Sequence, residues 1–345
     1  MAIERQRSAA TLRDVAERAG VGIKTASRVL NNEPGVRLET AAKVTAAAVA
    51  LGFRANRMAR NLRTGASTTT LGLVIGDMGN PFFASIARGV EMSLSASGYL
   101  LVIASHGEDP DREGHLVQEL AARRVDALMV VPAPDSGDAI AHEVARGLPV
   151  VVVDRSVEHR GLAVDEITLD NEGGAHALVS RLIADGHHRI GMVSDLDHLW
   201  TAERRRAGYR HALKDAGLPS DGSLVISGAH TPEEAYEAAR MLLHRHEPPT
   251  AIFAINNLTG RGVLRAVEQI DPSVEVAMFD DVDTADLFRH EVTLASYDPV
   301  AMGRAAAGYA WDRLNGYDGP PRRVMLPIGL RRVGGALPTK VAQAI

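Results

Sequence analysis

Apolar positions near the N-terminus recur at helical spacing in two short runs separated by a turn. The first run places one apolar stripe on Leu12, Val15, Ala16 and Ala19. Gly20 directly follows this stripe, and a glycine there can adopt the left-handed backbone that closes a helix. The pattern therefore predicts a first helix that ends at Gly20.

The second run begins at about Ile23, and its inward positions are Ala26, Val29 and Leu30. Its outward face then consists of Ile23, Lys24, Thr25, Ser27 and Arg28. These residue types suit a helix that enters the major groove of DNA, so the two runs predict a helix-turn-helix module. The alternative from periodicity alone is an ordinary amphipathic helical hairpin.

Beyond residue 70 the pattern changes to short apolar runs that alternate with amphipathic segments of helical length. The predicted strands are 71–75, 100–104, 127–131, 150–153, 190–193, 224–227, 251–255 and 274–279. The predicted helices are 82–96, 112–122, 174–184, 202–216, 232–244 and 300–314. This alternation is typical of parallel sheets covered by helices, and there are enough strands for two Rossmann-like halves.

Composition agrees with this organisation. A chain of 345 residues with 46% hydrophobic content is too long for one compact core. Aromatic residues make up only 4%, so aliphatic side chains must fill the buried strands. The absence of cysteine excludes disulfides and thiolate metal sites. We find no apolar run of bilayer length and no signal-peptide core, so we expect a cytoplasmic protein that does not contact membranes.

Charge is distributed unevenly along the chain. Arg54, Arg57, Arg60 and Arg63 recur at every third position, and such a basic stripe can lie along phosphates. Residues 1–65 contain 12 basic and 5 acidic side chains, a net charge of +7, whereas the remainder contains 26 and 38, a net charge of −12. A basic end on an acidic body favours DNA binding by that end alone.

Ligands of open parallel sheets bind at the carboxyl ends of the strands. The polar and aromatic residues that follow the predicted strands are Asp77, Asn80, Phe82, Phe83, His106, Pro132, Asp154, Arg155, Asn171, Asp195, Trp200, Arg205, His230, Asn256, Asp280 and Tyr297. In two facing halves these residues would line one cleft. The alternative for each residue is a turn-forming role, which is common after strands.

Several motifs occur together in an order that resembles the lactose-repressor/galactose-repressor (LacI/GalR) family of bacterial transcription regulators. They are residues 11–21, 25–31, 56–65, 80–83, 152–155, 169–171, 186–191, 208–213, 279–281 and 302–303. The resemblance implies an all-α helix-turn-helix headpiece (10–55), a hinge helix and linker (56–66) and a periplasmic-binding-protein-like α/β core. It assigns 70–157 with 298–322 to the N-lobe and 167–293 with 325–338 to the C-lobe. Chain crossings are expected near 157–167, 291–297 and 318–326.

The resemblance also implies a set of DNA-contacting residues: Thr11, Ile23, Lys24, Thr25, Ser27, Arg28, Asn31, Asn56, Arg57, Ala59, Arg60 and Leu62. Leu62 would act as a wedge in the minor groove, which kinks DNA by unstacking a base step. The alternative is that Leu62 packs against its dimer mate. Gly22 stands where the family has a helix-capping serine, and loss of a cap costs about 1 kcal/mol.

For the effector, the expected binding residues are Asp77, Asn80, Phe82, Phe83, Asp154, Trp200, Arg205, His230, Asn256, Asp280 and Tyr297. Arg205 and Asp280 match positions at which the family holds its effector. A guanidinium and a carboxylate can together grip vicinal hydroxyl groups. The alternatives are that Arg205 pairs with Glu203 on the surface and that Asp280 caps a turn. Asn257 stands where the family usually has an aspartate, which changes the charge of the pocket.

We therefore predict a homodimeric regulator, most simply a repressor, that binds a pseudo-palindromic double-stranded operator under the control of a small-molecule effector such as a sugar. An activator or dual regulator remains open within this class. Outside it, the alternatives are a transport-type sugar-binding protein and a nucleosidase-like hydrolase. We find no catalytic motif and expect neither a cofactor nor a metal. The histidines at 187–188 and 244–246 are interpreted as surface residues because no carboxylate spacing completes a metal site.

Overall fold

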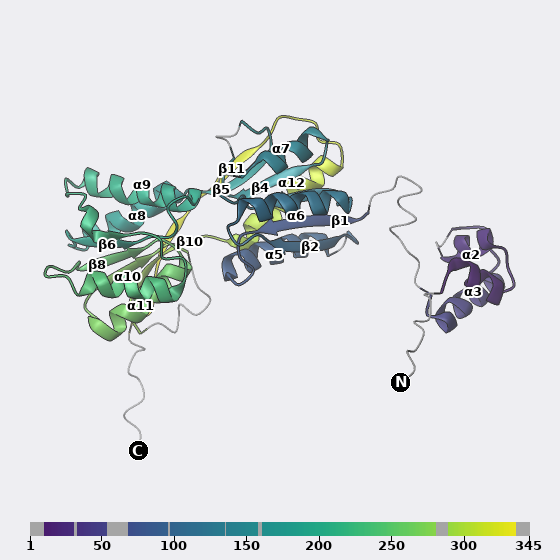
Figure 1. Cartoon of the computed structure of the whole chain (residues 1–345), viewed down its shortest axis with the longest axis horizontal. Helices are drawn as coiled ribbons and strands as arrows, with labels where there is room; N and C mark the ends of the chain where they lie inside the picture. Colours follow the sequence, from purple (N-terminus) through teal and green to yellow (C-terminus); the bar gives the residue numbers. More distant parts are fainter. Residues whose placement is uncertain are drawn as a thin grey trace, which may run out of the picture. The chain divides into compact units, whose positions relative to one another are not determined.

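The computed structural model describes residues 10–30, 33–53, 68–95, 97–134, 136–157, 161–280 and 289–335. The chain divides into two compact units, Met1–Thr68 and Thr69–Ile345. The first is a small helical headpiece, and the second is an α/β core with two sheets (Figure 1). No helix within the described ranges is both long and apolar enough to cross a membrane.

The headpiece contains α1 (Leu12–Arg18), α2 (Ile23–Leu30) and α3 (Leu38–Leu51). Thr11 begins α1 with a reciprocal capping box in which its hydroxyl accepts from the Asp14 amide. Gly20 has a φ of +65°, which confirms the predicted left-handed closure. The small core packs Val15 and Ala26 against Val44. Sequence periodicity did not predict α3, although this helix supplies one side of the headpiece core.

Lobe 1 is built on a parallel six-stranded sheet. Its strands, in spatial order, are β11 (Arg323–Leu326), β5 (Asp165–Leu169), β4 (Val150–Asp154), β3 (Ala127–Val130), β1 (Thr70–Ile75) and β2 (Leu100–Ser105). Its helices are α5 (Pro81–Leu94), α6 (Pro110–Ala122), α7 (Asp138–Ala145) and α12 (Pro299–Leu314). Helices α5 and α12 pack together, as do α6 and α7.

Lobe 2 has a second six-stranded sheet with the corresponding order. Its strands are β12 (Gly329–Val333), β10 (Val292–Ser296), β9 (Glu275–Met278), β8 (Ala251–Ala254), β6 (Ile190–Val193) and β7 (Val225–Ile226). Only β12 runs antiparallel to its neighbour. The helices are α8 (Asn171–Ala184), α9 (Trp200–Asp215), α10 (Pro232–Leu243) and α11 (Asn257–Ile270), with a short 3₁₀ helix, η2 (Gly222–Leu224).

All eight predicted strands and all six predicted core helices are present, with bounds that shift by up to three residues. The first crossing lies later than expected, because β5 still belongs to the sheet of lobe 1 and the chain enters lobe 2 only at α8. The third crossing follows β11, which pairs with β5 rather than with lobe 2. The pattern did not predict α7, α11, β5, β10, β11 or β12.

The polar sequence of β5 explains why it was interpreted as a crossing segment. Its first residue, Asp165, is buried and accepts hydrogen bonds from Arg313 on α12 and from Arg322 before β11. Burial raises the pKa of Asp165, but the bonds from the two guanidinium groups outweigh it and bring the pKa to about 2. A buried carboxylate held in this way replaces the apolar residue that periodicity would require.

Helix α12 returns to lobe 1, as predicted, because it fits closely against α5. A Cβ atom at Gly89 would lie 2.1 Å from the Val300 carbonyl oxygen, and one at Gly303 would lie 2.1 Å from that of Ile86. Only glycine permits two helix backbones to approach this closely. Asn80 caps α5, and Phe82 and Phe83 lie in its first turn.

Candidate functional site

The carboxyl ends of the two sheets converge on a small cavity between the lobes, which we call the cleft. Lobe 1 lines it with Asp77, Asn80, Phe82, Phe83, Glu108, Asp154 and Arg155, and lobe 2 with Asp195, Leu199, Thr201, Arg205, His230, Asn256, Leu258 and Asp280. Its volume is about 50 Å³, so the lobes are close together in this structure. Side chains that reach across it therefore contact residues of the opposite lobe.

Arg205 is held on the lobe 2 side by three acceptors. Its Nε donates to Asn171 Oδ1 at 2.8 Å, and Nη1 donates to the Ile255 carbonyl at 2.8 Å. Nη2 lies 3.4 Å from Asp280 Oδ1. The guanidinium also stacks on Phe279, with Cζ 3.6 Å from the ring centroid. With 5% of its surface exposed, Arg205 is a buried anchor, and the alternative of a surface pair with Glu203 is wrong.

Asp280 is the acceptor around which lobe 2 organises the cleft. Besides Arg205, it accepts from the Asn257 amide at 3.2 Å and from the Tyr297 hydroxyl. Burial and the Asp280 charge raise the pKa of Tyr297 well above its ordinary value, so this hydroxyl stays protonated as a donor. Tyr297 reaches Asp280 from behind and does not line the cleft; its ring packs on Phe82 of lobe 1.

Asp154 occupies the equivalent place at the end of β4 in lobe 1. Both aspartates adopt a left-handed backbone, with φ of +69° at Asp154 and +70° at Asp280. Asp154 is 3% exposed, and its Oδ1 has no hydrogen-bond partner among the described residues. Burial raises the pKa of Asp154 to about 6, against the opposing effects of Arg155 and Arg205. The carboxyl group is therefore positioned to donate to or accept from a ligand.

Arg155 follows Asp154 and forms a buried ion pair with Glu108, with Nη1 to Oε2 at 2.5 Å and Nη2 to Oε1 at 2.8 Å. Burial would raise the pKa of Glu108, but the Arg155 charge outweighs it and lowers that pKa overall. Nη1 also donates to the Pro132 carbonyl, whereas Nε has no hydrogen-bond partner within the described part of the chain. Two of the three nitrogens thus donate hydrogen bonds, and Nε makes only an ion pair with Asp154 Oδ2 at 3.7 Å.

Polar contacts connect the remaining lobe 2 residues and the two lobes. Asp195 accepts from His230 Nδ1 at 2.8 Å and from Asn256 Nδ2 at 2.6 Å. The bond to Asp195 raises the pKa of His230 above its ordinary value. Asn257 Nδ2 donates to Asn80 Oδ1 at 2.8 Å across the cleft. This last hydrogen bond joins the lobes directly.

The charges of the cleft decide which chemistry suits it. Five carboxyl groups line it, against two guanidinium groups and one imidazole. Arg155 and Arg205 already contact carboxylates. Asp154 Oδ1 and Arg155 Nε are buried there without hydrogen-bond partners among the described residues, and buried polar atoms of this kind are costly unless a ligand satisfies them. A neutral ligand rich in hydroxyl groups fits this arrangement.

Nine of the eleven predicted effector residues line the cleft: Asp77, Asn80, Phe82, Phe83, Asp154, Arg205, His230, Asn256 and Asp280. Tyr297 supports it from behind, and Trp200 lies outside it. The cleft is also lined by Glu108, Leu199, Thr201 and Leu258, to which no sequence pattern points. Glu108 lies three residues after β2, so a rule that searched further beyond each strand would have found it.

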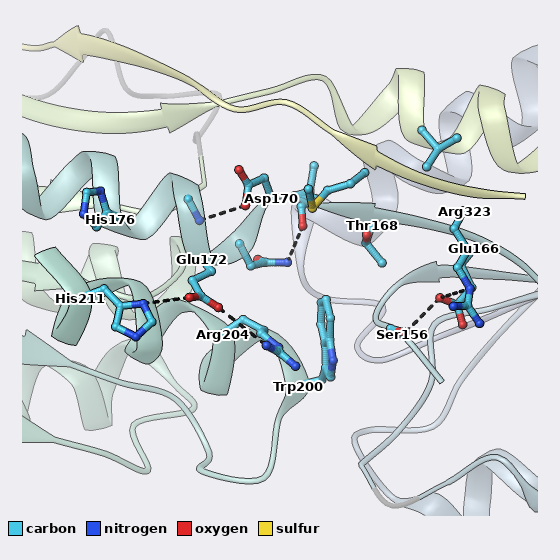
Figure 2. Close-up of a pocket in the computed structure, with 15 residues that line it drawn as sticks. Ser156, Glu166, Thr168, Asp170, Glu172, His176, Trp200, Arg204, His211 and Arg323 are labelled. Carbon is cyan, nitrogen blue, oxygen red and sulfur yellow. Dashed lines mark hydrogen bonds and ion pairs between the residues drawn. The ribbon is translucent and has the colours of Figure 1, made fainter. Parts of the chain in front are cut away.

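Trp200 lines two larger cavities beside the cleft. One of about 630 Å³ lies next to the crossing segments, and we call it the crossing cavity. Figure 2 shows the Trp200 indole between Glu172 and His211 of lobe 2 and Ser156 and Glu166 of lobe 1. Glu172 pairs with His211 Nδ1 at 2.9 Å, and Ser156 donates to Glu166 at 2.9 Å. Within the described residues, no group of three or more His, Asp or Glu side chains could hold a metal ion.

In the headpiece, the predicted DNA-reading face of α2 is accessible. Ile23 is 45% exposed, Lys24 is exposed, and Thr25 and Ser27 are partly buried. Arg28 instead donates from Nη2 to the Pro34 carbonyl at 2.6 Å, so it fastens the segment after α2. Thr11 caps α1. The remaining candidates, Asn31, Asn56, Arg57, Ala59, Arg60 and Leu62, and the hinge helix expected at 56–66 lie outside the described residues.

Comparison with known proteins agrees with both units. Residues 11–56 match the model of the bacterial regulatory proteins of the lacI family, and residues 68–312 match the periplasmic binding proteins and sugar binding domain of the LacI family. Catabolite control protein A of Priestia megaterium is 31% identical over 301 residues, which cover 86% of this chain and 90% of that protein. The transcriptional repressor PurR of Pectobacterium atrosepticum is 31% identical over 312 residues, or 88% and 90% of the two chains.

Solved structures give the same result. The transcriptional regulator CelR in complex with cellobiose has a TM-score of 0.70 at 30% identity, covering 94% of this chain and all of the other. The Lac repressor bound to ONPG in the repressed state shares the fold, with a TM-score of 0.80 at 24% identity over 94% and 98% of the two chains. The chain belongs to the LacI family of bacterial regulatory proteins and is a DNA-binding transcriptional regulator with an effector-controlled core.

Proposed function

We propose that this regulator senses a neutral sugar in the cleft, held by Asp154 and Arg155 of lobe 1 and by Arg205 and Asp280 of lobe 2. The observation that carries the proposal is a pair of buried polar atoms without hydrogen-bond partners among the described residues, Asp154 Oδ1 and Arg155 Nε, in side chains that line a cavity with five carboxyl groups. Carboxylates accept hydrogen bonds from sugar hydroxyl groups, and the guanidinium groups donate to them. The protein acts by binding rather than by catalysis.

The charge of the cleft distinguishes neutral sugars from phosphorylated ones. A phosphate group needs cations that are free to pair with it, whereas Arg155 and Arg205 each already contact a carboxylate. Bringing a dianion next to Asp154 and Asp280 also places like charges together at low dielectric. We therefore expect this core to discriminate against sugar phosphates.

Thermal unfolding of the full chain in the presence of neutral sugars and of their phosphate esters tests this proposal. A ligand at 100 times its Kd should stabilise the core by about 2.7 kcal/mol. The expected result is stabilisation by at least one neutral mono- or disaccharide that is lost when its phosphate ester replaces it. Stabilisation by the phosphate ester alone, or by no sugar at all, would contradict the proposal.

We further propose that α2 reads operator bases through Lys24, with Ile23, Thr25 and Ser27 beside it. Lys24 is exposed on this helix, and a lysine in the major groove donates to guanine. Lys24→Ala should cost about 1–3 kcal/mol at one base pair and change the preference there. Lys43→Ala, which removes an exposed lysine from α3, is the matched control. Titrations over single-base operator variants measure both; an unchanged preference profile for Lys24→Ala would contradict direct reading.

The operator complex is proposed to contain a homodimer, consistent with a pseudo-palindromic site. The support in this chain is the edge strand β2, where Leu100 is 64% and Ile103 36% exposed. An edge strand with exposed apolar residues favours association. Sugar binding would change the angle between the lobes and thereby the separation of the two hinge segments, a coupling of about 1–3 kcal/mol.

A further inference from the structure

A second cavity opens beside the cleft and is large enough for a ligand. We call it the outer cavity. Lobe 1 supplies Pro132, Pro134 and Arg155, and lobe 2 supplies Trp200 and Arg204. Its volume is about 600 Å³, whereas the cleft measures about 50 Å³. Binding sites for small molecules measure about 300–1,000 Å³, so the outer cavity already has the size that the cleft would reach only on opening.

Arg155 connects the two cavities because it lines both. It is 5% exposed, and its Nε has no hydrogen-bond partner among the described residues. The nearest carboxylate oxygen of its ion pair with Asp154 lies 3.7 Å from Nε, beyond hydrogen-bond distance. The side chain that lines both cavities therefore carries a buried N–H without a hydrogen bond, which a ligand oxygen would satisfy once the lobes part.

Trp200 supplies the apolar surface of the outer cavity. It is the first residue of α9 and is partly buried. Its side chain lines both the outer cavity and the crossing cavity, and Figure 2 shows it at the crossing cavity. Arg204 lies one turn further along α9, with Cζ 5.8 Å from the indole centroid. The indole and the Arg204 guanidinium thus lie side by side on α9, the helix that also carries Arg205 of the cleft.

The residue types around this indole are those that bind a sugar ring. The flat π face of tryptophan packs against the apolar C–H face of a pyranose. Glu203, Arg204 and His198 also line the outer cavity, and they provide donors and acceptors for hydroxyl groups at the rim. The two prolines form the facing wall from lobe 1. Neither wall requires a charged ligand.

We propose that the outer cavity is a second sugar subsite, so that the effector is a neutral disaccharide or longer oligosaccharide. One ring enters the cleft between Asp154 and Asp280 as the lobes move apart, and the next ring stacks on Trp200. Arg155 Nε donates near the glycosidic linkage. This inference rests on the proposed sugar-sensing function and names the size of its ligand. It also explains why Trp200, an expected effector residue, lies outside the cleft.

Tryptophan fluorescence tests the subsite because the chain has two tryptophans. Trp311 lies on α12 beside Tyr99, 41% exposed and away from all three cavities. Full-length Trp311→Phe protein therefore reports on Trp200 alone, and full-length Trp200→Phe protein is the matched control that reports on Trp311. Both are titrated with glucose, galactose and ribose and with cellobiose, maltose and lactose, and calorimetry gives each Kd.

The subsite is supported if a disaccharide binds at least about tenfold more tightly than its component monosaccharides, a difference of about 1.4 kcal/mol. That disaccharide should change the fluorescence of Trp200 and not of Trp311. Trp200→Ala should then remove the advantage of the disaccharide while Trp200→Phe retains most of it, which separates a stacking role from a folding defect.

Three other outcomes overturn the inference. If a monosaccharide binds as tightly as every disaccharide and leaves Trp200 fluorescence unchanged, the sugar-sensing proposal stands and the second subsite is wrong. If no sugar binds by calorimetry, the proposed function fails and the subsite fails with it. Binding of a disaccharide that perturbs neither tryptophan would also exclude stacking on Trp200.

Discussion

The two lobes place an aspartate at the same point but give it different surroundings. Asp154 and Asp280 follow equivalent strands and share a left-handed backbone. Asp280 is bound by Arg205, Tyr297 and the Asn257 amide. Asp154 has one oxygen atom without a partner in the described structure and a pKa raised to about 6 by burial. The Asp280 carboxylate of lobe 2 therefore already has its hydrogen bonds, whereas the Asp154 carboxylate of lobe 1 has only a loose ion pair with Arg155 at 3.7 Å and one oxygen without a hydrogen bond among the described residues.

This difference shows how one fold can assign ligand affinity to one lobe and the conformational response to the ligand to the other. A carboxylate with its hydrogen bonds already made loses little freedom when a ligand arrives. A buried carboxylate oxygen without a hydrogen bond is unfavourable until a ligand satisfies it, so Asp154 favours the state in which a ligand contacts it. We infer that lobe 2 holds the sugar first and that Asp154 stabilises the sugar-bound state. Four predictions test the contrast.

The largest effect is expected from Arg205→Ala, because it removes the main cation from Asp280. Loss of one partner from a buried ion pair costs about 3–5 kcal/mol, and Asn171 Oδ1 and the Ile255 carbonyl also lose a donor. Chemical denaturation of the core should show a loss of this size. Arg210→Ala, an exposed arginine on the same helix, should stay within about 0.5 kcal/mol of the wild type.

A loss below about 1 kcal/mol for Arg205→Ala would mean that Asp280 does not depend on this cation. The inference that lobe 2 holds its Asp280 carboxylate in place before a ligand arrives would then be wrong. The prediction concerns stability without sugar, so it can be measured before the effector is identified.

Asp154→Asn should instead increase the stability of the core, and the size of this increase should depend on pH. Burial raises the pKa of Asp154 from 3.8 to about 6, so the folded chain holds this proton more tightly than the unfolded chain. The free-energy cost of ionising Asp154 in the folded chain is absent below pH 4, grows between pH 4 and 6 and is complete above pH 6. At pH 8 the variant should be more stable than the wild type by roughly 1–3 kcal/mol.

Asparagine tolerates the left-handed backbone at this position, so the substitution tests the charge and not the turn. Denaturation midpoints at pH 4 and pH 8 provide the measurement, and the difference between variant and wild type should vanish at the lower pH. A variant that is less stable at pH 8 would show that the Asp154 carboxylate is satisfied.

The sequence predicted the parts of this picture that depend on local pattern. Strands β4 and β9 are apolar runs, and the rule that ligands meet strand ends then placed Asp154 and Asp280 in one cleft. The first two headpiece helices followed from an apolar stripe and a glycine. Helix α3 was missed because six of its fourteen residues are alanine, which gives weak contrast between its faces.

Contacts between distant residues could not be predicted in the same way. Nothing near Asp165 in the chain indicates that Arg313 and Arg322 satisfy it, so β5 was interpreted as a crossing. Glu108 enters the cleft only because Arg155, 47 residues later, binds it. Trp200 follows a strand like its neighbours, but the start of α9 directs it into other cavities. Each error reflects a partner that only the fold brings close.

A smaller loss is expected from Tyr297→Phe, which removes one donor from Asp280 and keeps the ring between Phe82 and Phe279. A hydrogen bond to a charged group contributes about 1.5–3 kcal/mol, and the low end applies because Asp280 keeps Arg205 and the Asn257 amide. Chemical denaturation measures the loss. Tyr236→Phe, whose hydroxyl bonds to exposed Gln269, is the control. An effect no larger than that of the control would show that Asp280 does not need this donor.

The smallest effect is expected at Asn257, which joins the lobes by donating to Asn80 Oδ1. Asn257→Ala loses one neutral hydrogen bond, about 0.5–1.5 kcal/mol, and Asn80 keeps its cap on the Phe82 amide. Asn257→Asp should cost more, because it places a carboxylate against an acceptor oxygen that cannot turn away without breaking the cap. Small-angle scattering without sugar should show lobe separation in the order wild type, Ala, Asp. If all three chains scatter identically, this hydrogen bond does not hold the lobes together, and other contacts between them, such as that of Tyr297 with Phe82, do so instead.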